Sequence, residues 1–564
     1  MAVEDDIRAF LEENGPKYLE EVGFPWFRCP SISSGKNPNI EGIAASAEHV
    51  RGALQNLGLE AEIINVEGIN PLVFAQTRQD PERRTVLFYG HGDVKSVRPE
   101  AWNTPPFDPT FIDGKLYGRG VADDKGQTFA LMLGVLAAKE VKGGELPVNV
   151  KFLIEHNEET GLPDELVSWM GSHRELLAAD GYVIADCEQY DDSGSPTFIR
   201  SLKGISAVEL MMNKRDAFGL ARLVSSLYDT ETRRVALPGF YKSVDDRGPI
   251  RDEHILQLLA DPNGKILGKV LTPEIGCDQA THRGRRPTYD PLALFFADPH
   301  PVRDEVERTI KITARGPPKG LHSGSFGGPV QNPGLYLARA TVILESLRNL
   351  GLGVSIDYIA YGESNDFLKT NISPTGEMQV TIYGGDSRDI AESVEVYVAG
   401  VWTAGDAGLF DYEMVDRDHR IDYLERECFK EGQFSTPRAG LSFRLVPNQD
   451  PNVVHSTLNQ LVALHGATLG ESHQSKPFIA DSDSLFCKTF SSAAENYYGK
   501  PALHFEEGGS IGIALELGKM GPVLLCAYGP KEARAHNPNE WVRVGDLMNG
   551  AGATALSLLR FGEE

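Results

Sequence analysis

The chain has 564 residues, more than one ordinary domain contains, and 41% of them are hydrophobic, which is enough to fill a sizeable core. Its 80 acidic residues outnumber the 55 basic ones, and a net charge of −25 excludes nucleic acid and anionic membranes as partners through repulsion. The acidic start, the lack of a long apolar run and six scattered cysteines without a CxxC pair predict a cytoplasmic protein with no membrane span, disulfide framework or cysteine-rich zinc site.

In chain order, residues 4–21 and 42–58 have the pattern of amphipathic helices. Later runs are continuously apolar and β-rich, and each ends in polar residues; they are 85–89, 148–154, 181–185 and 522–528. Such runs are typical of strands buried on both faces of a parallel sheet. Residues 127–141 are apolar nearly all round and predict a buried crossover helix. The predicted fold class is therefore α/β, with a mostly parallel sheet flanked by helices.

The middle of the chain has a different character, with more Gly and Pro breaks between shorter strand-like patterns. These patterns cover residues 205–212, 309–314, 378–383 and 441–446. They predict an inserted α+β domain of residues 203–472. Residues 473–564 would then return to the first domain, which makes that domain, 1–202 and 473–564, discontinuous.

Polar residues gather where the predicted strands end. His91 and Asp93 follow the first strand two residues apart, so their side chains point the same way. An imidazole beside a carboxylate suits a metal ligand with the acid that orients it, although a purely structural pair is the alternative. Asp123 lies in a Gly-rich segment just before the crossover helix, where capping of the helix N-terminus is the alternative.

The later strands end in the same manner. Glu158 and Glu159 follow the second strand and point in different directions, so one could bind a metal while the other faces a water; a solvated acidic turn is the alternative. Asp186 closes the third strand and His536 follows the last one, where a strand-end cap and a surface loop histidine are the alternatives. Sites in open α/β sheets lie outside the carboxyl ends of the strands, so these residues are expected at one edge.

Taken together, the motifs resemble the family of dinuclear zinc peptidases that includes carnosinase-like dipeptidases, succinyl-diaminopimelate desuccinylase and aminoacylase. The matching stretches, in the family's order, are GHGDV, WNTPPFDPTFIDGKLYGRGVADDKG, EHNEETG, IADCE, EEGGSI and AHNPNEW. The resemblance, closest to the carnosinase-like dipeptidases, implies these metal ligands: His91, Asp123, Glu159, Asp186 and His536. It further implies that Asp123 bridges two ions, that Asp93 orients His91 and that Glu158 is the general acid and base.

The implied cofactor is a pair of divalent ions, for which nitrogen and oxygen ligands without thiolate suit zinc, and also cobalt or manganese. The implied reaction is hydrolysis of an amide bond in a dipeptide or short peptide by a metal-bridged hydroxide, with Glu158 as the general base. An amidase or deacylase acting on N-acyl amino acids or another small amide is the alternative. A metal-binding protein without catalysis is the third hypothesis.

The resemblance also implies a lid and dimerisation role for residues 203–472, and a homodimer as the assembly. His322, in LHSGSFGG, resembles the lid histidine that holds the oxyanion, in the same subunit or in the partner. Arg444 matches a lid arginine that clamps the substrate carboxylate, and an arginine on the surface of a strand is the alternative. Glu507 could bind the free amine of a short peptide. Gly508, Gly509 and Ser510 match a backbone turn that faces the substrate in the family, and a purely structural turn is the alternative.

Two departures from the family pattern affect the substrate side. Glu506 stands where the family has an Arg before Glu-Gly-Gly-Ser, which reverses a charge near the substrate. Asp186 and His322 lie farther apart along the chain than the pattern has them, and the segments 220–223 to 238–241 resemble residues that normally follow the lid histidine. An enlarged or rearranged lid is therefore expected.

Overall fold

The computed structural model divides the chain into two units that we describe separately. Unit 1 contains Met1–Ser201, Ile479–Phe505 and Ile511–Glu564, and unit 2 contains Leu202–Phe478 and Glu506–Ser510. The described residues are 3–35, 37–212, 217–229, 234–235, 288–295, 307–315, 321–322, 337–338, 341–342, 353–361, 371–372, 375–383, 410–415, 438–445, 449–507, 510–531 and 533–563. Among them, no helix combines the length and the apolar character needed to cross a membrane.

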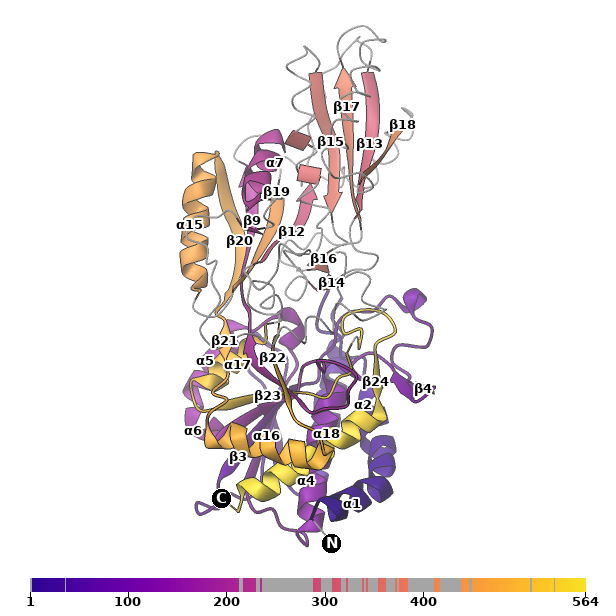
Figure 1. Ribbon diagram of the computed structural model, residues 1–564, viewed down its shortest axis with the longest axis vertical. Coiled ribbons are helices and arrows are strands. Elements are labelled where there is room, and N and C mark those ends of the chain that lie inside the picture. The colour runs from indigo at the N-terminus through magenta and orange to yellow at the C-terminus, as the bar shows by residue number, and fades with distance from the viewer. Residues whose placement is uncertain are drawn as a thin grey trace. The chain divides into compact units, whose positions relative to one another are not determined.

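A mixed sheet dominates unit 1, and its four central strands are parallel (Figure 1). The strand order is β1-β2-β6-β3-β7-β23-β8-β21, with β22 paired to β8. The strands are β1 Glu60–Ile64, β2 Leu72–Gln76, β3 Thr85–His91, β6 Asn149–Glu155, β7 Gly181–Ile184, β8 Thr197–Leu202, β21 Phe478–Ile479, β22 Leu503–Glu507 and β23 Val523–Ala527. The α/β fold class with a mostly parallel central sheet is thereby confirmed.

The core of unit 1 forms where helices bury apolar side chains against this sheet. Helix α4, Lys125–Val141, joins β3 to β6 through the chain and is buried along almost its whole length, as its sequence predicts. It packs against α18, Val544–Phe561, and α18 in turn packs against α16, Leu485–Tyr498. Two stacked rings on neighbouring strands, Phe88 and Phe152, lie in the same core at 5.1 Å between ring centres.

Shorter elements complete unit 1. The other helices are α1 Val3–Tyr18, the π-helical η1 Leu19–Gly23, α2 Phe24–Phe27, α3 Ile40–Asn56, η2 Pro99–Ala101, η3 Glu158–Thr160, α5 Asp164–Ser172, α6 Arg174–Leu177 and α17 Gly512–Gly518. A small sheet has the order β24-β5-β4, from strands Trp541–Arg543, Lys115–Tyr117 and Thr110–Ile112. This sheet joins a segment near the C-terminus to the segment that leads into α4.

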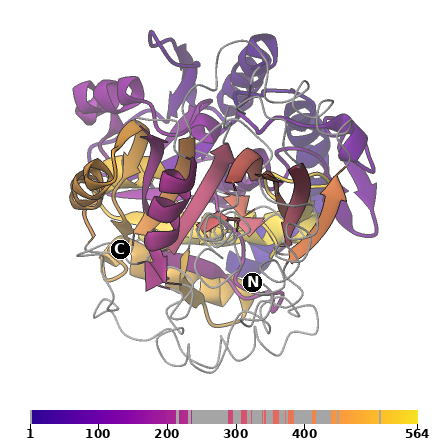
Figure 2. The same ribbon diagram turned by 90° about the horizontal axis from the view of Figure 1, so that it is seen from above.

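Unit 2 contains two four-stranded antiparallel sheets (Figures 1 and 2). The first has the order β12-β19-β9-β20, from Thr288–Phe295, Arg438–Leu445, Gly204–Met212 and Ala467–Ser475. The second has the order β15-β17-β13-β18, from Gly353–Tyr361, Thr375–Tyr383, Glu307–Arg315 and Phe410–Val415. Two strand pairs are β10 Tyr228–Asp229 with β11 Arg234–Val235, and β14 Leu321–His322 with β16 Asn371–Ile372. The helices α7 Ala217–Ser226 and α15 Pro451–Leu464 both pack on β9.

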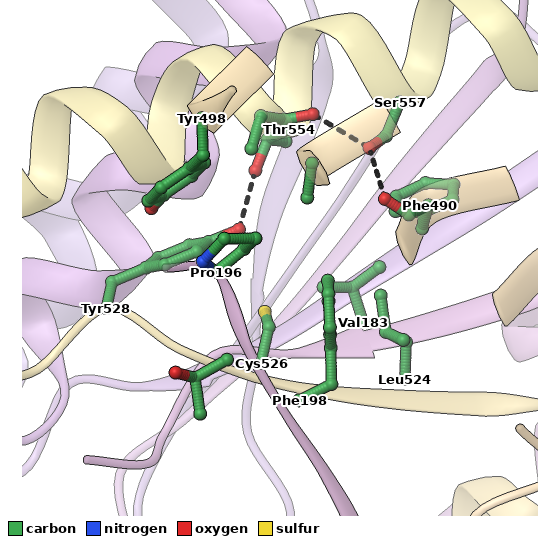
Figure 3. A pocket seen from close by; sticks show the side chains of 13 residues that line it. Val183, Pro196, Phe198, Phe490, Tyr498, Leu524, Cys526, Tyr528, Thr554 and Ser557 are labelled. Atoms are coloured by element: carbon green, nitrogen blue, oxygen red, sulfur yellow. Dashed lines mark hydrogen bonds between the residues drawn. The ribbon is translucent and has the colours of Figure 1, made fainter. Parts of the chain in front are cut away.

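A small cavity in unit 1 lies between the sheet and the helices α16 and α18 (Figure 3). Its lining is mostly apolar, with Val183 and Phe198 on the sheet side and Phe490 on the helix side. Two of its polar groups are paired with each other, because the hydroxyl of Tyr528 lies 3.1 Å from that of Thr554 (Figure 3). None of the predicted site residues lines this cavity, so it belongs to the core packing.

Candidate metal centre

The carboxyl ends of the parallel strands carry the predicted ligands to one edge of the sheet of unit 1. Strand β3 runs two residues farther than its sequence predicts and ends at His91, which pairs with Glu155 at the end of β6. Glu158 and Glu159 form the turn η3 just after β6, and Asp186 follows β7. Because β6, β3 and β7 are adjacent and parallel, their ends meet at this edge.

The other two predicted ligands arrive on loops. Asp123 was considered as the N-cap of α4, but the N-cap position is occupied by the next residue, Asp124, whose side chain makes no cap hydrogen bond. Capping therefore does not explain the Asp123 carboxylate. The peptide bond between these two residues is cis. His536 lies in the loop that follows β23 and has φ +64°, in the left-handed region that side chains rarely adopt. A functional contact is one reason for a chain to keep such a conformation.

Five side chains converge as two clusters that share one carboxylate. Nε2 of His91 lies 3.2 Å from one oxygen of Asp123 and 3.8 Å from an oxygen of Asp186. Nε2 of His536 lies 3.0 Å from the other oxygen of Asp123 and 3.1 Å from Oε2 of Glu159. In each cluster the potential ligand atoms all lie within 4.8 Å of one another. Asp123 therefore has the position that a bridging carboxylate requires.

Asp93 stands behind the first cluster and is fully buried. Nδ1 of His91 lies 3.1 Å from the backbone carbonyl oxygen of Asp93 and 3.4 Å from its carboxylate. The carboxylate accepts hydrogen bonds from the hydroxyl of Ser33 at 2.5 Å and from the backbone N–H of Glu159 at 3.1 Å. Asp93 thus contacts the ring of His91 and also anchors the backbone that carries Glu159.

The charges of the cluster shift the pKa values of its members in opposite directions. Burial opposes the charged form of Asp123, but His536 and His91 hold the pKa of its carboxyl well below the usual range. Burial also lowers the pKa of His536, but Glu159 and Asp123 outweigh it and raise that pKa to about 10. For Asp186, burial raises the pKa to about 6. Protons on the histidines here balance the carboxylates, a role that bound cations can take over.

The residues present fit a pair of divalent metal ions. Within the described part of the chain, Nε2 of His91 and Oε2 of Glu159 are buried, and each makes ion-pair contacts but no hydrogen bond of normal geometry. Buried polar atoms are almost always hydrogen-bonded, so these two atoms are suited to bind a cation. The donor set is two imidazole nitrogens and three carboxylates, which suits zinc and also cobalt or manganese.

A family model matches residues 87–560, and its description is peptidase family M20/M25/M40. This match covers most of the chain and includes all five predicted metal ligands. The chain belongs to this family. The resemblance predicted from the six sequence motifs is thereby confirmed.

Relatives within the family include enzymes with dipeptidase names. The Beta-Ala-His dipeptidase of Homo sapiens is 34% identical over 205 residues, which are 33% of this chain and 39% of that protein. The Cys-Gly metallodipeptidase dug1 of Schizosaccharomyces pombe is 40% identical over 277 residues, 46% of this chain and 52% of that protein. The matched regions thus span about half the length of these relatives or less.

Solved structures of the family share the fold. Human carnosine dipeptidase 1 superposes with a TM-score of 0.63 at 19% identity, and the match covers 100% of both chains. A metallo-carboxypeptidase from Sulfolobus solfataricus superposes with a TM-score of 0.57 at 20% identity, covering 97% of this chain and 100% of the other. At such low identity these matches support the architecture and leave the substrate open.

A buried carboxylate that the sequence motifs did not single out joins the two loops of the centre. Glu540 is fully buried and accepts hydrogen bonds from the backbone N–H groups of Gly120, Ala122 and Asp123 at 2.9–3.1 Å. It also forms an ion pair of 2.7 Å with Arg119, which is 2% exposed. The segment AHNPNEW, which supplies His536, thus also clamps the loop that supplies Asp123. The opposite charges in the two quoted motifs were the available signal.

Lys95 was missed as well, although its position in the chain provides a signal. It continues the alternation of His91 and Asp93 by two more residues, which directs its side chain to the same side in an extended chain. Its ammonium group lies 2.8 Å from Oε2 of Glu159. A cation of this protein therefore stands directly beside the second cluster.

The predicted substrate-side residues belong to unit 2 and are described only in part. The backbone of His322 pairs with Asn371, and that of Arg444 pairs with Ile205. Glu507 ends β22, and its side chain, like those of His322 and Arg444, lies outside the described residues. Gly508 and Gly509 lie outside them entirely. The hydroxyl of Ser510 donates to the backbone carbonyl oxygen of Lys203 at 2.5 Å.

Both departures from the family pattern fall in unit 2. Glu506 is 4% exposed, so the residue that replaces the family's arginine is a buried carboxyl group. Of the segments that resemble displaced lid elements, 220–223 lies within α7, and 238–241 lies outside the described residues. The expected enlargement or rearrangement of the lid therefore stays a prediction, as does the homodimer.

Proposed function

We propose that this protein hydrolyses the amide bond of a dipeptide or short peptide with two divalent metal ions held by the five converging residues. The observation that carries the proposal is the shared carboxylate of Asp123, whose two oxygens lie 3.2 Å from His91 and 3.0 Å from His536. Paired metal sites a few ångströms apart serve hydrolases that must stabilise charge on both an attacking and a leaving oxygen or nitrogen. The dipeptidase names of two relatives support peptides as the substrate class.

The metal ions, once bound, would polarise the scissile carbonyl group and lower the pKa of a bound water toward neutrality. The ligand assignment proposed is His91, Asp123 and Asp186 for one ion, and Asp123, Glu159 and His536 for the other. Asp93 would keep the ring of His91 oriented through the contacts at its Nδ1. The clamp by Glu540 would keep Asp123 in the bridging position.

Glu158 is the proposed general base and acid. It is only partly exposed and is adjacent to the ligand Glu159. Burial, together with the nearby carboxylates of Asp186, Glu159 and Asp123, raises the pKa of Glu158 well above its usual range, although His91 opposes this. A raised pKa suits a group that takes a proton from the attacking water and delivers it to the leaving amine nitrogen.

Substrate recognition is proposed to come from unit 2, as the family resemblance implies. His322 would donate to the developing oxyanion, from its own subunit or from the partner in a homodimer. Arg444 would bind the carboxylate of the substrate through two parallel hydrogen bonds. Glu507 would bind the free amine, with the backbone of Gly508, Gly509 and Ser510 facing the substrate.

A substrate screen with the metal-loaded protein tests this proposal. Free dipeptides should be hydrolysed, hydrolysis should stop after chelation, and added zinc should restore it. Hydrolysis of N-acyl amino acids without any cleavage of free dipeptides would instead support the alternative, an amidase or deacylase. The buried Glu506, in place of an arginine, is the specific feature that keeps this alternative open. Two bound ions with no hydrolysis of any amide would overturn both.

A further inference from the structure

We propose that Lys95 weakens cation binding at the Asp123–Glu159–His536 cluster, so that this cluster fills only after the His91–Asp123–Asp186 cluster. The inference rests on the two-metal centre proposed above and adds a residue that sets the order of loading. Lys95 acts on a bound cation through its positive charge beside Glu159, and it does not take part in the bond-breaking steps.

The ammonium group of Lys95 contacts a proposed ligand directly. Nζ of Lys95 lies 2.8 Å from Oε2 of Glu159, the oxygen that also faces His536 at 3.1 Å. The same ammonium donates a hydrogen bond to the backbone carbonyl oxygen of Glu159. The side chain of Glu159 is 1% exposed and that of Lys95 is 28% exposed, so water screens these charges from the lysine side only. A metal ion at this oxygen would share it with a fixed positive charge.

The two clusters differ in the charges that surround them. In the described part of the chain, Asp186 has a single ion pair, and its partner is His91. The surroundings of His91 also include a further carboxylate, because its Nδ1 lies 3.4 Å from Asp93. An extra carboxylate thus stands behind the first cluster, while an ammonium group faces the second. The field of the protein therefore favours a divalent ion in the first cluster.

Glu159 is held in position by contacts that do not involve the ammonium group. Its Oε1 accepts a hydrogen bond from the backbone N–H of Lys95 at 3.0 Å, which no side-chain substitution removes. Its own backbone N–H donates to Asp93 at 3.1 Å. Loss of the ammonium group should therefore remove a repulsion and leave the ligand in place. Neutral substitution is expected to tighten the second cluster.

The test is a titration of the metal-free protein with Zn²⁺ in the presence of a competing chelator. The wild-type protein should bind two ions in two steps, the second weaker. Lys95→Met should tighten the second step by roughly tenfold or more, because a like charge beside the ion is removed, and leave the first step unchanged. Lys95→Arg, which keeps the charge, should retain the wild-type separation of the two steps.

Two further variants complete the design. Lys142→Met removes an exposed lysine that pairs with Glu563 at 3.0 Å just after the C-terminal end of α4, and it should not change either step. Lys95→Gln removes the charge and keeps a hydrogen-bond donor, and it replaces Lys95→Met if that variant does not fold; the same tightening is expected.

An unchanged or weakened second step in the neutral Lys95 variants overturns the inference, as do two equal steps in the wild-type protein. Uptake of fewer than two ions at saturating Zn²⁺ overturns instead the two-metal centre on which the inference rests. Metal affinity is the readout throughout, so a loss of turnover in any variant does not affect the conclusion.

Discussion

The ligands that stand at the sheet edge and the ligands that stand on loops are held by different forces. His91 ends β3, and Glu159 and Asp186 follow β6 and β7; all three strands are buried, so the positions of these ligands derive from the apolar core. Asp123 and His536 lie in loops that meet at the carboxylate of Glu540. The comparison teaches that polar contacts from distant parts of the chain complete a site that the sheet alone leaves open. Removing one residue of either kind should therefore have different consequences.

The largest effect is expected from Asp123, the loop residue that both clusters share. Asp123→Ala should release both ions and lower kcat/KM by more than about a thousandfold, because each ion loses a ligand and the bridge is gone. Asp186→Ala, at the sheet edge, should lose one ion and keep the other, because it belongs to one cluster only. Metal analysis after dialysis measures both. Two ions retained in Asp123→Ala would rule out the bridging role.

A separation of metal binding from catalysis is expected at Glu158, which lies beside a sheet-edge ligand without being one. Glu158→Ala should keep two ions and lose about three orders of magnitude in kcat, the scale of general acid and base catalysis with its coupled steps. Steady-state rates and metal content on the same sample measure the separation. Near-normal turnover would remove Glu158 from its role, and the parallel variant Glu516→Ala serves as a control for an acidic residue paired elsewhere, with Lys519.

The loop clamp should be the more fragile of the two supports. Glu540→Gln weakens a buried ion pair with Arg119 and disturbs hydrogen bonds to three backbone N–H groups. The free energy of unfolding should fall by about 3 kcal/mol, since breaking a buried pair leaves an uncompensated charge. Zinc affinity should fall by about 10- to 100-fold, as is usual when a group that orients a ligand is lost.

Denaturant unfolding and zinc titration measure these two effects of Glu540→Gln. A matched control is Glu516→Gln, which removes the ion pair with Lys519, a side chain that is 54% exposed. The control should change stability by less than about 1 kcal/mol, because exposed pairs contribute little. Equal stability changes in both variants would show that the clamp does not support the loops.

The ligands at the sheet edge could be predicted from the sequence because the strands that carry them are buried on both faces. Residues 148–154 were predicted as a strand, and β6 covers Asn149–Glu155. Such strands are continuously apolar, so their ends and the polar residues that follow are visible in the sequence. The resemblance to the family then supplied the loop-borne residues Asp123 and His536, which no local pattern distinguishes from a helix cap or a surface histidine.

The supporting residues could not be predicted from the sequence because their contacts join parts of the chain that are far apart. Gly120 and Glu540 are separated by 420 positions, and no local periodicity links them. Ser33 reaches Asp93 over 60 positions and likewise leaves no trace in the pattern. Lys95 differs from these, since it continues an alternation that was already noted at His91 and Asp93, but a lysine is not a metal ligand and therefore attracted no role.

The smallest expected effect is the pH dependence of zinc binding. It tests the raised pKa of the loop histidine, His536, against the usual pKa of a histidine. Burial opposes the charged form of His536, but Glu159 and Asp123 raise its pKa to about 10 in the metal-free protein. His536 is therefore protonated at neutral pH, and its ring must release that proton before Nε2 can bind a metal. Zinc affinity should rise by about tenfold per pH unit for each proton released, until the pH reaches the pKa.

Calorimetric titrations of the metal-free protein with Zn²⁺ in buffers of different ionisation enthalpy count the released protons directly. His536→Gln should release about one proton fewer than the wild-type protein, because glutamine carries no titrating ring, whereas a substitution at the remote Lys142 should not alter the count. The sign follows from the direction of the shift: a pKa of His536 raised above the usual value of a histidine means that protons compete with the metal at neutral pH. Zinc affinity that stays constant from about pH 6.5 to about pH 8.5 would contradict this, since His536 would then already be neutral before the metal binds.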